Sequence, residues 1–373
     1  MAKLVIGANK NFGVPSIVKP ASQYYVGKCV DANGKLKRVS HLIDFSNITD
    51  MDDYVMDCAY EHDSEITGTI DMSSMTTLSG NNCATDMFSY TNITGIDLSS
   101  LVNVTGPYAC VKTFKGCEHL ASVDLSSLET IGTCSFANTF IDCVALTSID
   151  LPELTTVGTQ GCQEAFKGCT GLTTANLPKL ANLSANALSY TFSECSSLAT
   201  VNLGTSIVNI TADKAFYYTF SDCTSLSTIN FSSLKTVSGA QSLYALFMGC
   251  TNLKTPNFSS LEALDGSECA SGLFFQCGIQ NYTFTSLKSL SGDAALKYAF
   301  AGCPSLTSVS FPALKTTSFG SYTTQFDSML LGVSGCTVHF PSNLQSVIGN
   351  WTSVKNGFKG TNTTILFDLP ATN

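Results

Sequence analysis

The chain has 373 residues, of which 44% are hydrophobic and only 13% charged, and its formal net charge is −9. This acidity argues against a nucleic-acid partner, because phosphate binding needs clustered Lys and Arg side chains. No apolar run approaches the length needed to span a bilayer, so insertion into a membrane is not expected either.

The first 40 residues lie outside the repeats described below and predict a small β element. Residues 24–30 and 36–39 flank Asn33-Gly34, and Asn-Gly is a strong signal for a hairpin turn. Residues 1–10 contain too short an apolar stretch for a secretory leader. We expect residues 1–40 either to cap the first coil of the repeats or to anchor the protein to something else.

Residues 41–345 contain about twelve copies of one unit, F-x-x-C-x-x-L-x-x-(V/I)-(D/N)-(L/F)-(S/P)-x-L. Successive phenylalanines of this unit are 26 to 28 residues apart, which lies within the range of leucine-rich repeats. They are Phe88, Phe114, Phe140, Phe166, Phe192, Phe220, Phe247, Phe274 and Phe300. A cysteine follows three residues after all but the first, at Cys117, Cys143, Cys169, Cys195, Cys223, Cys250, Cys277 and Cys303.

Each unit predicts one short parallel strand and a return segment. In residues 146–151 (LTSIDL) the apolar side chains face inward, whereas Ser148 and Asp150 face outward. A Pro, Ser or Gly then ends the strand. The return segment, such as residues 163–168, has the apolar spacing of a short helix. The glycines that follow suit a helix C-terminus: Gly116, Gly168, Gly249 and Gly302.

The predicted fold is therefore an α/β repeat solenoid with one parallel strand per coil and short helices or turns on the return side. One coil cannot bury its apolar face alone, whereas stacked coils share a continuous core. Residues 346–373 are expected to close the stack as a C-terminal cap, because they contain the only tryptophan, Trp351, and a strand-like segment at residues 364–369. Both caps are expected to contain β structure.

The unit resembles the BspA-like branch of leucine-rich repeat proteins, whose units read F-x-G-C-x-x-L-x-x-(V/I)-x-L-P. The match extends over residues 40–345 and is closest at residues 114–117, 166–169, 247–250 and 300–303. The return segments here are longer than in the usual family unit. The resemblance implies a bacterial, parasite or phage surface protein with an adhesive role.

The outward strand positions form two polar columns, which we interpret as the candidate binding surface. The main column is acidic in its first half and carries amides in its second half: Asp71, Asp97, Asp124, Asp150, Asn176, Asn202, Asn230 and Asn257. Two residues earlier on the same face lie hydroxyl groups: Ser122, Ser148, Thr174, Thr200 and Thr228. No cofactor is expected. Calcium, which prefers hard oxygen ligands, could bind at Asp97, Asp124 and Asp150, but a solvated polar face that keeps the sheet soluble is the favoured interpretation of these carboxylates.

No constellation of catalytic residues is recognisable, so an enzyme is not expected. The cysteines in register with the phenylalanines are expected in the core as small apolar residues.

The favoured function is recognition of a protein on a host or cell surface through the strand face, with a glycan as the second choice. Sugar sites usually include an aromatic platform, and the two columns contain none. A phage tail or virion receptor-binding protein and an intracellular scaffold remain alternatives. The ligand, the oligomeric state and the cellular location stay open, with a surface or virion location favoured.

Overall fold

The computed structural model describes residues 45, 47–315, 319 and 324–372, together with three two-residue strands nearer the N-terminus. By its internal contacts the chain divides into two compact units, Met1–Leu177 and Pro178–Asn373. Each unit is a stack of coils with parallel strands, which confirms the predicted repeat solenoid.

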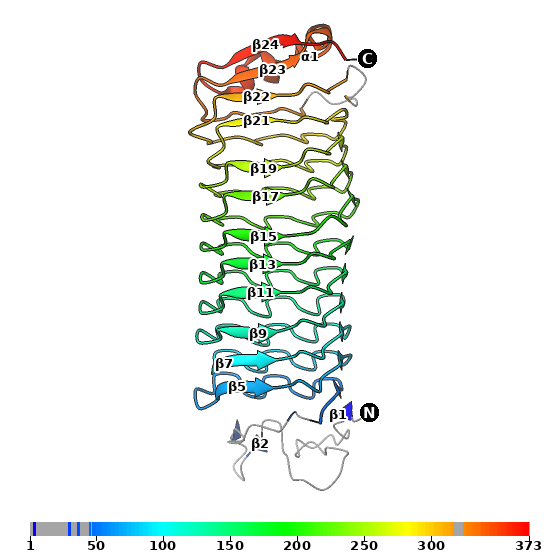
Figure 1. Ribbon diagram of the computed structural model, residues 1–373, viewed down its shortest axis with the longest axis vertical. Coiled ribbons are helices and arrows are strands. Elements are labelled where there is room, and N and C mark those ends of the chain that lie inside the picture. The colour runs from blue at the N-terminus through cyan, green and yellow to red at the C-terminus, as the bar shows by residue number, and fades with distance from the viewer. Residues whose placement is uncertain are drawn as a thin grey trace. The chain divides into compact units, whose positions relative to one another are not determined.

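Unit 1 presents one short strand from each coil on the same face. Figure 1 shows these strands side by side and pointing the same way. The second to fourth coils pair in parallel with Asp71 opposite Asp97 and Asp97 opposite Asp124. The strands are β5 (Thr67–Asp71), β7 (Asn92–Asp97), β9 (Ser122–Asp124), β11 (Ser148–Asp150) and β13 (Thr174–Asn176).

A second ladder in unit 1 comes from the stretch after each strand, where the chain crosses the core. The sequence gives no separate signal for these two-residue strands, which pair in parallel. They are β6 (Thr77–Leu78), β8 (Asn103–Val104), β10 (Thr130–Ile131) and β12 (Thr156–Val157). The coils that begin with β5, β7, β9 and β11 therefore have a second short strand in addition to the predicted one.

Unit 2 repeats the same plan. Its strand face consists of β15 (Thr200–Asn202), β17 (Thr228–Asn230), β19 (Thr255–Asn257), β21 (Asn281–Thr283), β22 (Ser308–Ser310), β23 (Thr337–Pro341) and β24 (Thr364–Leu369). Its second ladder pairs β16 (Asn209–Ile210), β18 (Thr236–Val237) and β20 (Ala263–Leu264) in parallel. The short strand β14 (Asn182–Leu183) also belongs to this unit.

The C-terminal segment adds another strand to unit 2. The predicted strand at residues 364–369 is confirmed as β24, which pairs in parallel with β23. Between the two strands lie four short helical turns: η1 (Ser342–Leu344), α1 (Gln345–Ile348), α2 (Thr352–Lys355) and η2 (Gly357–Lys359).

Near the N-terminus, β2 (Cys29–Val30) and β3 (Leu36–Lys37) pair antiparallel, as the predicted hairpin requires. The Asn33-Gly34 turn itself lies outside the described residues. In addition, β1 (Lys3–Leu4) pairs in parallel with β4 (Asp50–Met51), a contact that the sequence did not predict. The boundaries of the two caps, at residues 40 and 346, remain predictions.

The return segments are tandem turns and not helices. In one coil of unit 1, Cys134, Asn138 and Asp142 all have positive φ, between 54° and 61°. Their N–H groups donate to the next coil, as from Asn138 to the Gln163 carbonyl at 2.8 Å. The N–H groups three residues after Cys134 and Asn138 instead close turns within the coil, as from Ile141 to the Asn138 carbonyl at 3.3 Å.

The predicted role of the glycines at a helix C-terminus is therefore wrong. Gly116, Gly168, Gly249 and Gly302 occupy the last positive-φ position of the tandem turns, with φ between 65° and 74°. At Gly168 a Cβ atom would also collide with the carboxylate of Asp142 in the preceding coil.

The core of each unit is built from the two columns that the repeat predicts. Neighbouring phenylalanines from Phe88 to Phe166 stack with ring centroids 5.1–5.8 Å apart, and those from Phe192 to Phe274 stack with centroids 5.7–5.9 Å apart. The Phe300 ring is tilted by 37° against the Phe274 ring, with centroids 5.3 Å apart. The eight cysteines of the repeat register are buried beside these phenylalanines, which confirms their predicted place.

The cysteine column also makes hydrogen bonds that the sequence did not predict. Seven of these thiols donate to the carbonyl of the phenylalanine in the preceding coil, at sulfur–oxygen distances of 3.0–3.1 Å. A small side chain with a weak donor therefore suits this position better than a purely apolar one. None of the fifteen cysteines whose side chains the structure describes forms a disulfide.

Candidate functional site

The strand face of unit 1 carries the predicted acidic column in register. Asp71, Asp97 and Asp124 lie opposite one another on β5, β7 and β9, and Asp150 lies opposite Asn176 on β11 and β13. The second column also lies on this face, with Ser122, Ser148 and Thr174 all exposed. Asp97 and Asn176 are half-buried, and the other three residues of the main column are exposed.

The strand face of unit 2 carries the amide half of the main column. Asn202 and Thr200 are exposed on β15. Asn230 and Thr228 on β17 lie opposite Asn257 and Thr255 on β19, and all four are exposed. Every predicted binding residue therefore projects from a strand face, as the alternation of the sequence requires.

Most of the main column has a structural task that sequence reasoning missed. One side-chain oxygen accepts a hydrogen bond from the backbone N–H two residues later, at 3.0 Å in each case. The donors to Asp71, Asp97, Asp124, Asn202, Asn230 and Asn257 are Ser73, Ser99, Ser126, Gly204, Ser232 and Ser259. This Asx turn ends the strand and redirects the chain into the core. The bonds from Ser73 also hold the pKa of the Asp71 carboxyl below its usual value.

Asp150 is an exception, because Pro152 stands where the donating N–H would be. Its Oδ1 atom accepts a hydrogen bond from Nδ2 of Asn176 on the next strand at 2.6 Å instead. Pro178 occupies the same place after Asn176. The prolines therefore identify, in the sequence, the positions at which a column residue cannot form the Asx turn.

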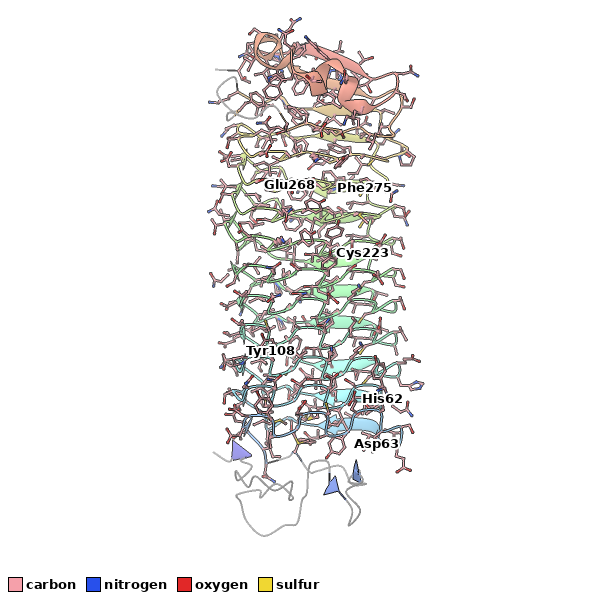
Figure 2. All side chains as sticks on the ribbon, turned by 180° about the vertical axis from the view of Figure 1, so that it is seen from behind. His62, Asp63, Tyr108, Cys223, Glu268 and Phe275 are labelled. Carbon is pink, nitrogen blue, oxygen red and sulfur yellow. The ribbon has the colours of Figure 1, made fainter. Side chains whose placement is uncertain are left out.

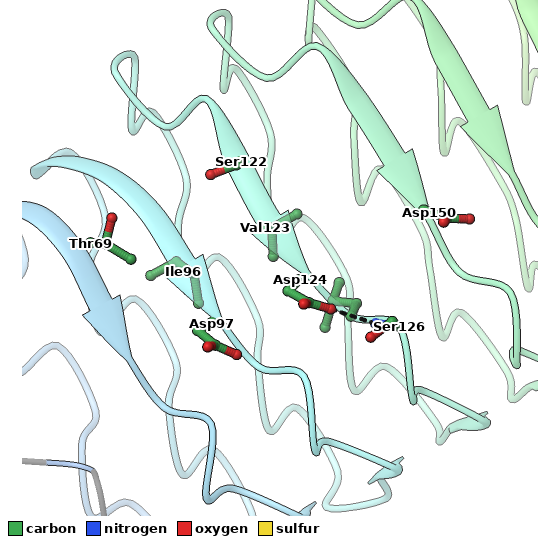
Figure 3. A pocket seen from close by; sticks show the side chains of 9 residues that line it. Thr69, Ile96, Asp97, Ser122, Val123, Asp124, Ser126 and Asp150 are labelled. Atoms are coloured by element: carbon green, nitrogen blue, oxygen red, sulfur yellow. Dashed lines mark hydrogen bonds between the residues drawn. The ribbon is translucent and has the colours of Figure 1, made fainter.

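A hollow of about 470 Å³ lies on the strand face of unit 1 and brings part of the predicted set together. Figure 3 shows Asp97, Asp124 and Asp150 on three successive strands around it, with the bond from Ser126 to Asp124 dashed. Its lining residues are Thr69, Ile96, Asp97, Ser122, Val123, Asp124, Leu125, Ser126 and Asp150. Asp71, Ser148, Thr174 and Asn176 do not line it. The hollow thus offers carboxylates and hydroxyls around a small apolar floor.

Within the described part of the chain, no three His, Cys, Asp or Glu side chains are grouped as metal ligands would be. The carboxylates of the hollow come from different strands, and those of Asp97 and Asp124 each have one oxygen engaged in an Asx turn. This arrangement places negative charge along a row of strands.

An aromatic cluster lies on the return turns of unit 2, away from the two strand columns in which the sequence predicts the binding surface. Its members are Tyr190, Tyr217, Tyr218, Tyr244, Phe275 and Tyr298, all half-buried. Figure 2 views the chain from behind and labels Phe275 and Glu268, which come from the return turns of one coil. The signal was available in the sequence, because Tyr190, Tyr218 and Tyr298 each stand two residues before a phenylalanine of the repeat.

The sequence model for the BspA-type leucine-rich repeat region matches in six copies, over residues 47–153, 81–219, 137–265, 163–294 and 218–350. Among solved structures, a leucine-rich repeat protein from Bacteroides ovatus is similar, with 20% identity, coverage of 78% of this chain and 88% of that chain, and a TM-score of 0.40.

Two further structures are similar at lower scores. The leucine-rich repeat protein of T. pallidum has 21% identity, with coverage of 50% of this chain and 77% of that one, and a TM-score of 0.34. The pneumococcal vaccine antigen PcpA has 13% identity, with coverage of 91% and 82% and a TM-score of 0.32.

None of the curated proteins matches the chain significantly. In the part that the structure describes, every helix falls short of the length and apolarity needed to cross a membrane. The family model spans most of the chain. The structure also has the stacked coils with parallel strands that the sequence repeat predicts. The chain belongs to the BspA-type leucine-rich repeat family.

Proposed function

We propose that the protein is a non-enzymatic recognition module that binds a protein ligand on a host or cell surface through its strand face. Leucine-rich repeat stacks are typically binding scaffolds, and their ligands are generally proteins. The proposal depends chiefly on one observation: six of the eight residues of the main column are held by backbone N–H groups of their own strand ends before any ligand arrives. Side chains that are already ordered lose little entropy on binding.

The charge of the hollow in unit 1 favours a basic ligand surface. Asp97, Asp124 and Asp150 line it, and its lining includes no Lys or Arg. Complementary charge accelerates encounter and selects among partners more than it adds affinity. Lys or Arg side chains of the ligand are therefore expected opposite these carboxylates.

Site-specific photo-crosslinking tests the proposal. A benzoylphenylalanine at Ser122 lies in the hollow, whereas one at Tyr108 lies on the return turns, where the native residue is already an exposed aromatic. Applied to a panel of purified surface proteins, the Ser122 probe is expected to crosslink a ligand that the Tyr108 probe does not. Binding of that ligand should weaken at least tenfold in the Asp97→Asn/Asp124→Asn double variant, which keeps the Asx turns. Crosslinking through Tyr108 alone, or unchanged binding by the double variant, would refute the use of this face.

We also propose that recognition does not require calcium. The support is the absence of a converging ligand group in the described residues and the engagement of one oxygen each of Asp97 and Asp124 in Asx turns. Calorimetric titration with calcium to millimolar concentration is expected to give only heats of dilution. Saturable heat that disappears in the Asp97→Asn/Asp124→Asn variant would show that these carboxylates hold the ion.

A further inference from the structure

One position of the return turns in unit 2 carries tyrosine in some coils and a very small residue in others. Tyr190, Tyr218, Ala245, Gly272 and Tyr298 all stand two residues before a phenylalanine of the repeat. Their backbones are alike, with φ between 49° and 63°. The N–H groups of Tyr218, Ala245 and Gly272 also donate alike to the next coil, at 2.7–2.9 Å. Side-chain size is therefore the main feature that changes along this column.

Where the tyrosines are missing, the surface contains a slot of about 230 Å³. Ala245, Ser271 and Gly272 are buried and form its floor, and Tyr218, Tyr244, Met248, Phe275, Tyr298 and Leu331 complete its lining. The side chains of this second group are partly exposed, and that of Leu331 is 44% exposed. The slot thus has aromatic and aliphatic walls that open to solvent.

The fold does not require the slot. A Cβ atom on Gly272 would meet nothing closer than Ala245, at 3.7 Å, which is ordinary van der Waals contact. The positive φ at this position does not demand glycine either, because Tyr298 adopts a similar φ in the following coil. A continuous tyrosine column would fill the slot, so the small residues Ala245 and Gly272 are what keep it open to a ligand.

The walls offer flat aromatic faces edged by hydroxyl groups. Tyr218 stacks on Tyr190 with ring centroids 5.0 Å apart and planes 13° apart. The hydroxyls of Tyr218 and Tyr244 hydrogen bond to each other. Burial raises the pKa of Tyr218 to about 12 and also raises the pKa of Tyr244, so both phenols stay neutral at physiological pH. A tyrosine in this state combines an apolar surface with a hydrogen-bonding tip.

The chemistry of the lining restricts the class of occupant. No charged residue lines the slot, and the Lys297 ammonium already lies over the Tyr298 ring, 5.3 Å from its centroid. The N–H groups of Ala245 and Gly272 in the floor are engaged between coils, so an extended peptide cannot add to them as a strand. What remains is a neutral ligand with an apolar face and a hydroxylated edge, and a pyranose ring has both.

We propose that this slot is a carbohydrate site, in which a neutral sugar ring stacks on the tyrosine walls and exchanges hydrogen bonds with their hydroxyls. The site lies on the return turns of unit 2 and is separate from the strand-face role proposed above.

An array of defined neutral oligosaccharides, followed by titration of the best binder, tests the proposal. Ala245→Tyr continues the tyrosine column into the slot, and Tyr298→Ala removes a wall. Each is expected to weaken binding at least tenfold. Tyr90→Ala is the matched control, because Tyr90 is an exposed tyrosine with a φ of 59° in the return turns of unit 1. In saturation-transfer NMR the ring C–H protons of the sugar should receive the strongest signal from the wild-type protein, and this signal should be lost in Ala245→Tyr.

Absence of any binder on the array, or equal binding by Ala245→Tyr and the wild type, would overturn the proposal. Unfolding curves of both slot variants establish that they are folded. The Ser122 crosslinking experiment is independent of these variants, so failure of the sugar site and failure of the strand-face proposal give different results.

Discussion

At the scale of single residues, the main column shows how one side chain can serve the fold and a ligand together. One carboxylate oxygen of Asp124 accepts a hydrogen bond from the Ser126 N–H, and the side chain remains exposed. Asn230 makes the same bond to Ser232 in unit 2. Aspartate and asparagine are therefore interchangeable for the Asx turn, and the choice between them sets the charge of the face.

This interchangeability predicts a specific stability pattern. Asp124→Asn should leave the free energy of unfolding within about 0.5 kcal/mol of the wild type, because the accepting oxygen is kept. Asp124→Ala should lower it by about 0.5–1.5 kcal/mol, the net value of one hydrogen bond. Urea denaturation measures both. Asp150→Ala is the control, since Asp150 has no Asx turn to lose, and a loss as large as that of Asp124→Ala would count against this account.

The thiols allow a second prediction at this scale. Burial raises the pKa of the Cys83, Cys169, Cys269 and Cys303 thiols to about 12, so these groups are protonated and inert at neutral pH. Among the cysteines whose side chains are described, Cys58 alone is not buried. In a Cys29→Ser background, a thiol reagent such as DTNB should label one cysteine quickly in the native protein and all fifteen after denaturation. Rapid native labelling that survives Cys58→Ser would show that the core opens readily.

At the scale of elements, the return segments show where sequence reasoning failed. An apolar residue every fourth position is typical of a helix, yet tandem turns with a positive φ every fourth residue produce the same spacing. Phe136 and Phe140 are buried four residues apart in such turns. The difference lies in the hydrogen bonds, which run from Phe136 to Gly161 and from Phe140 to Ala165 in the next coil. A periodicity cannot distinguish bonds within a coil from bonds between coils.

The absence of long helices in the described residues has a spectroscopic consequence. The two assigned α-helices have four residues each, α1 and α2. Far-UV circular dichroism should therefore lack the strong paired minima at about 208 and 222 nm that extended α-helix gives. A spectrum with helix content near the ~30% usual for globular domains would contradict the tandem turns.

The strands, by contrast, could be predicted closely, because alternation places each side chain on one face without knowledge of the neighbouring coil. The segment 148–150 was predicted with Ile149 inward and Asp150 outward, and only Ile149 is buried. The two-residue second ladder, the Asx turns and the tyrosine slot all depend on which coil residues lie next to one another. The slot exists because Ala245 and Gly272 are small. It can be recognised in the sequence only when the coils are aligned on their phenylalanines.

At the scale of the whole molecule, both units fill their cores with the same two columns, so each coil from Phe114 to Phe300 adds a buried thiol next to a buried ring. Free cysteine contributes little hydrophobic area compared with leucine. Its advantage here is the bond to the phenylalanine carbonyl of the preceding coil, such as Cys169 to Phe140 at 3.0 Å. The benefit of that bond and of burial exists only while the thiol keeps its proton, and this couples the stability of the whole stack to pH.

The direction of this pH dependence follows from the pKa of the thiol in the folded and in the unfolded chain. The pKa of the Cys169 thiol is about 12 in the folded chain, chiefly because burial disfavours the thiolate, against about 8.5 when unfolded. The unfolded state therefore binds fewer protons between these values. The stabilisation is complete below pH of about 8.5 and is lost as the pH rises towards 12.

Each such thiol should lower the free energy of unfolding by about 1.4 kcal/mol per pH unit within this window. Because both units contain several of these thiols, the urea midpoint is expected to be nearly constant from pH 7 to 8.5 and to fall steeply above pH 9. Cys169→Ala should be less stable than the wild type at pH 7, since it loses buried contacts. Its free energy of unfolding should nevertheless fall less steeply with pH than that of the wild type, because one fewer thiol titrates. Parallel pH profiles for Cys169→Ala and the wild type would mean that Lys and Tyr ionisation, and not the thiol column, causes the alkaline unfolding.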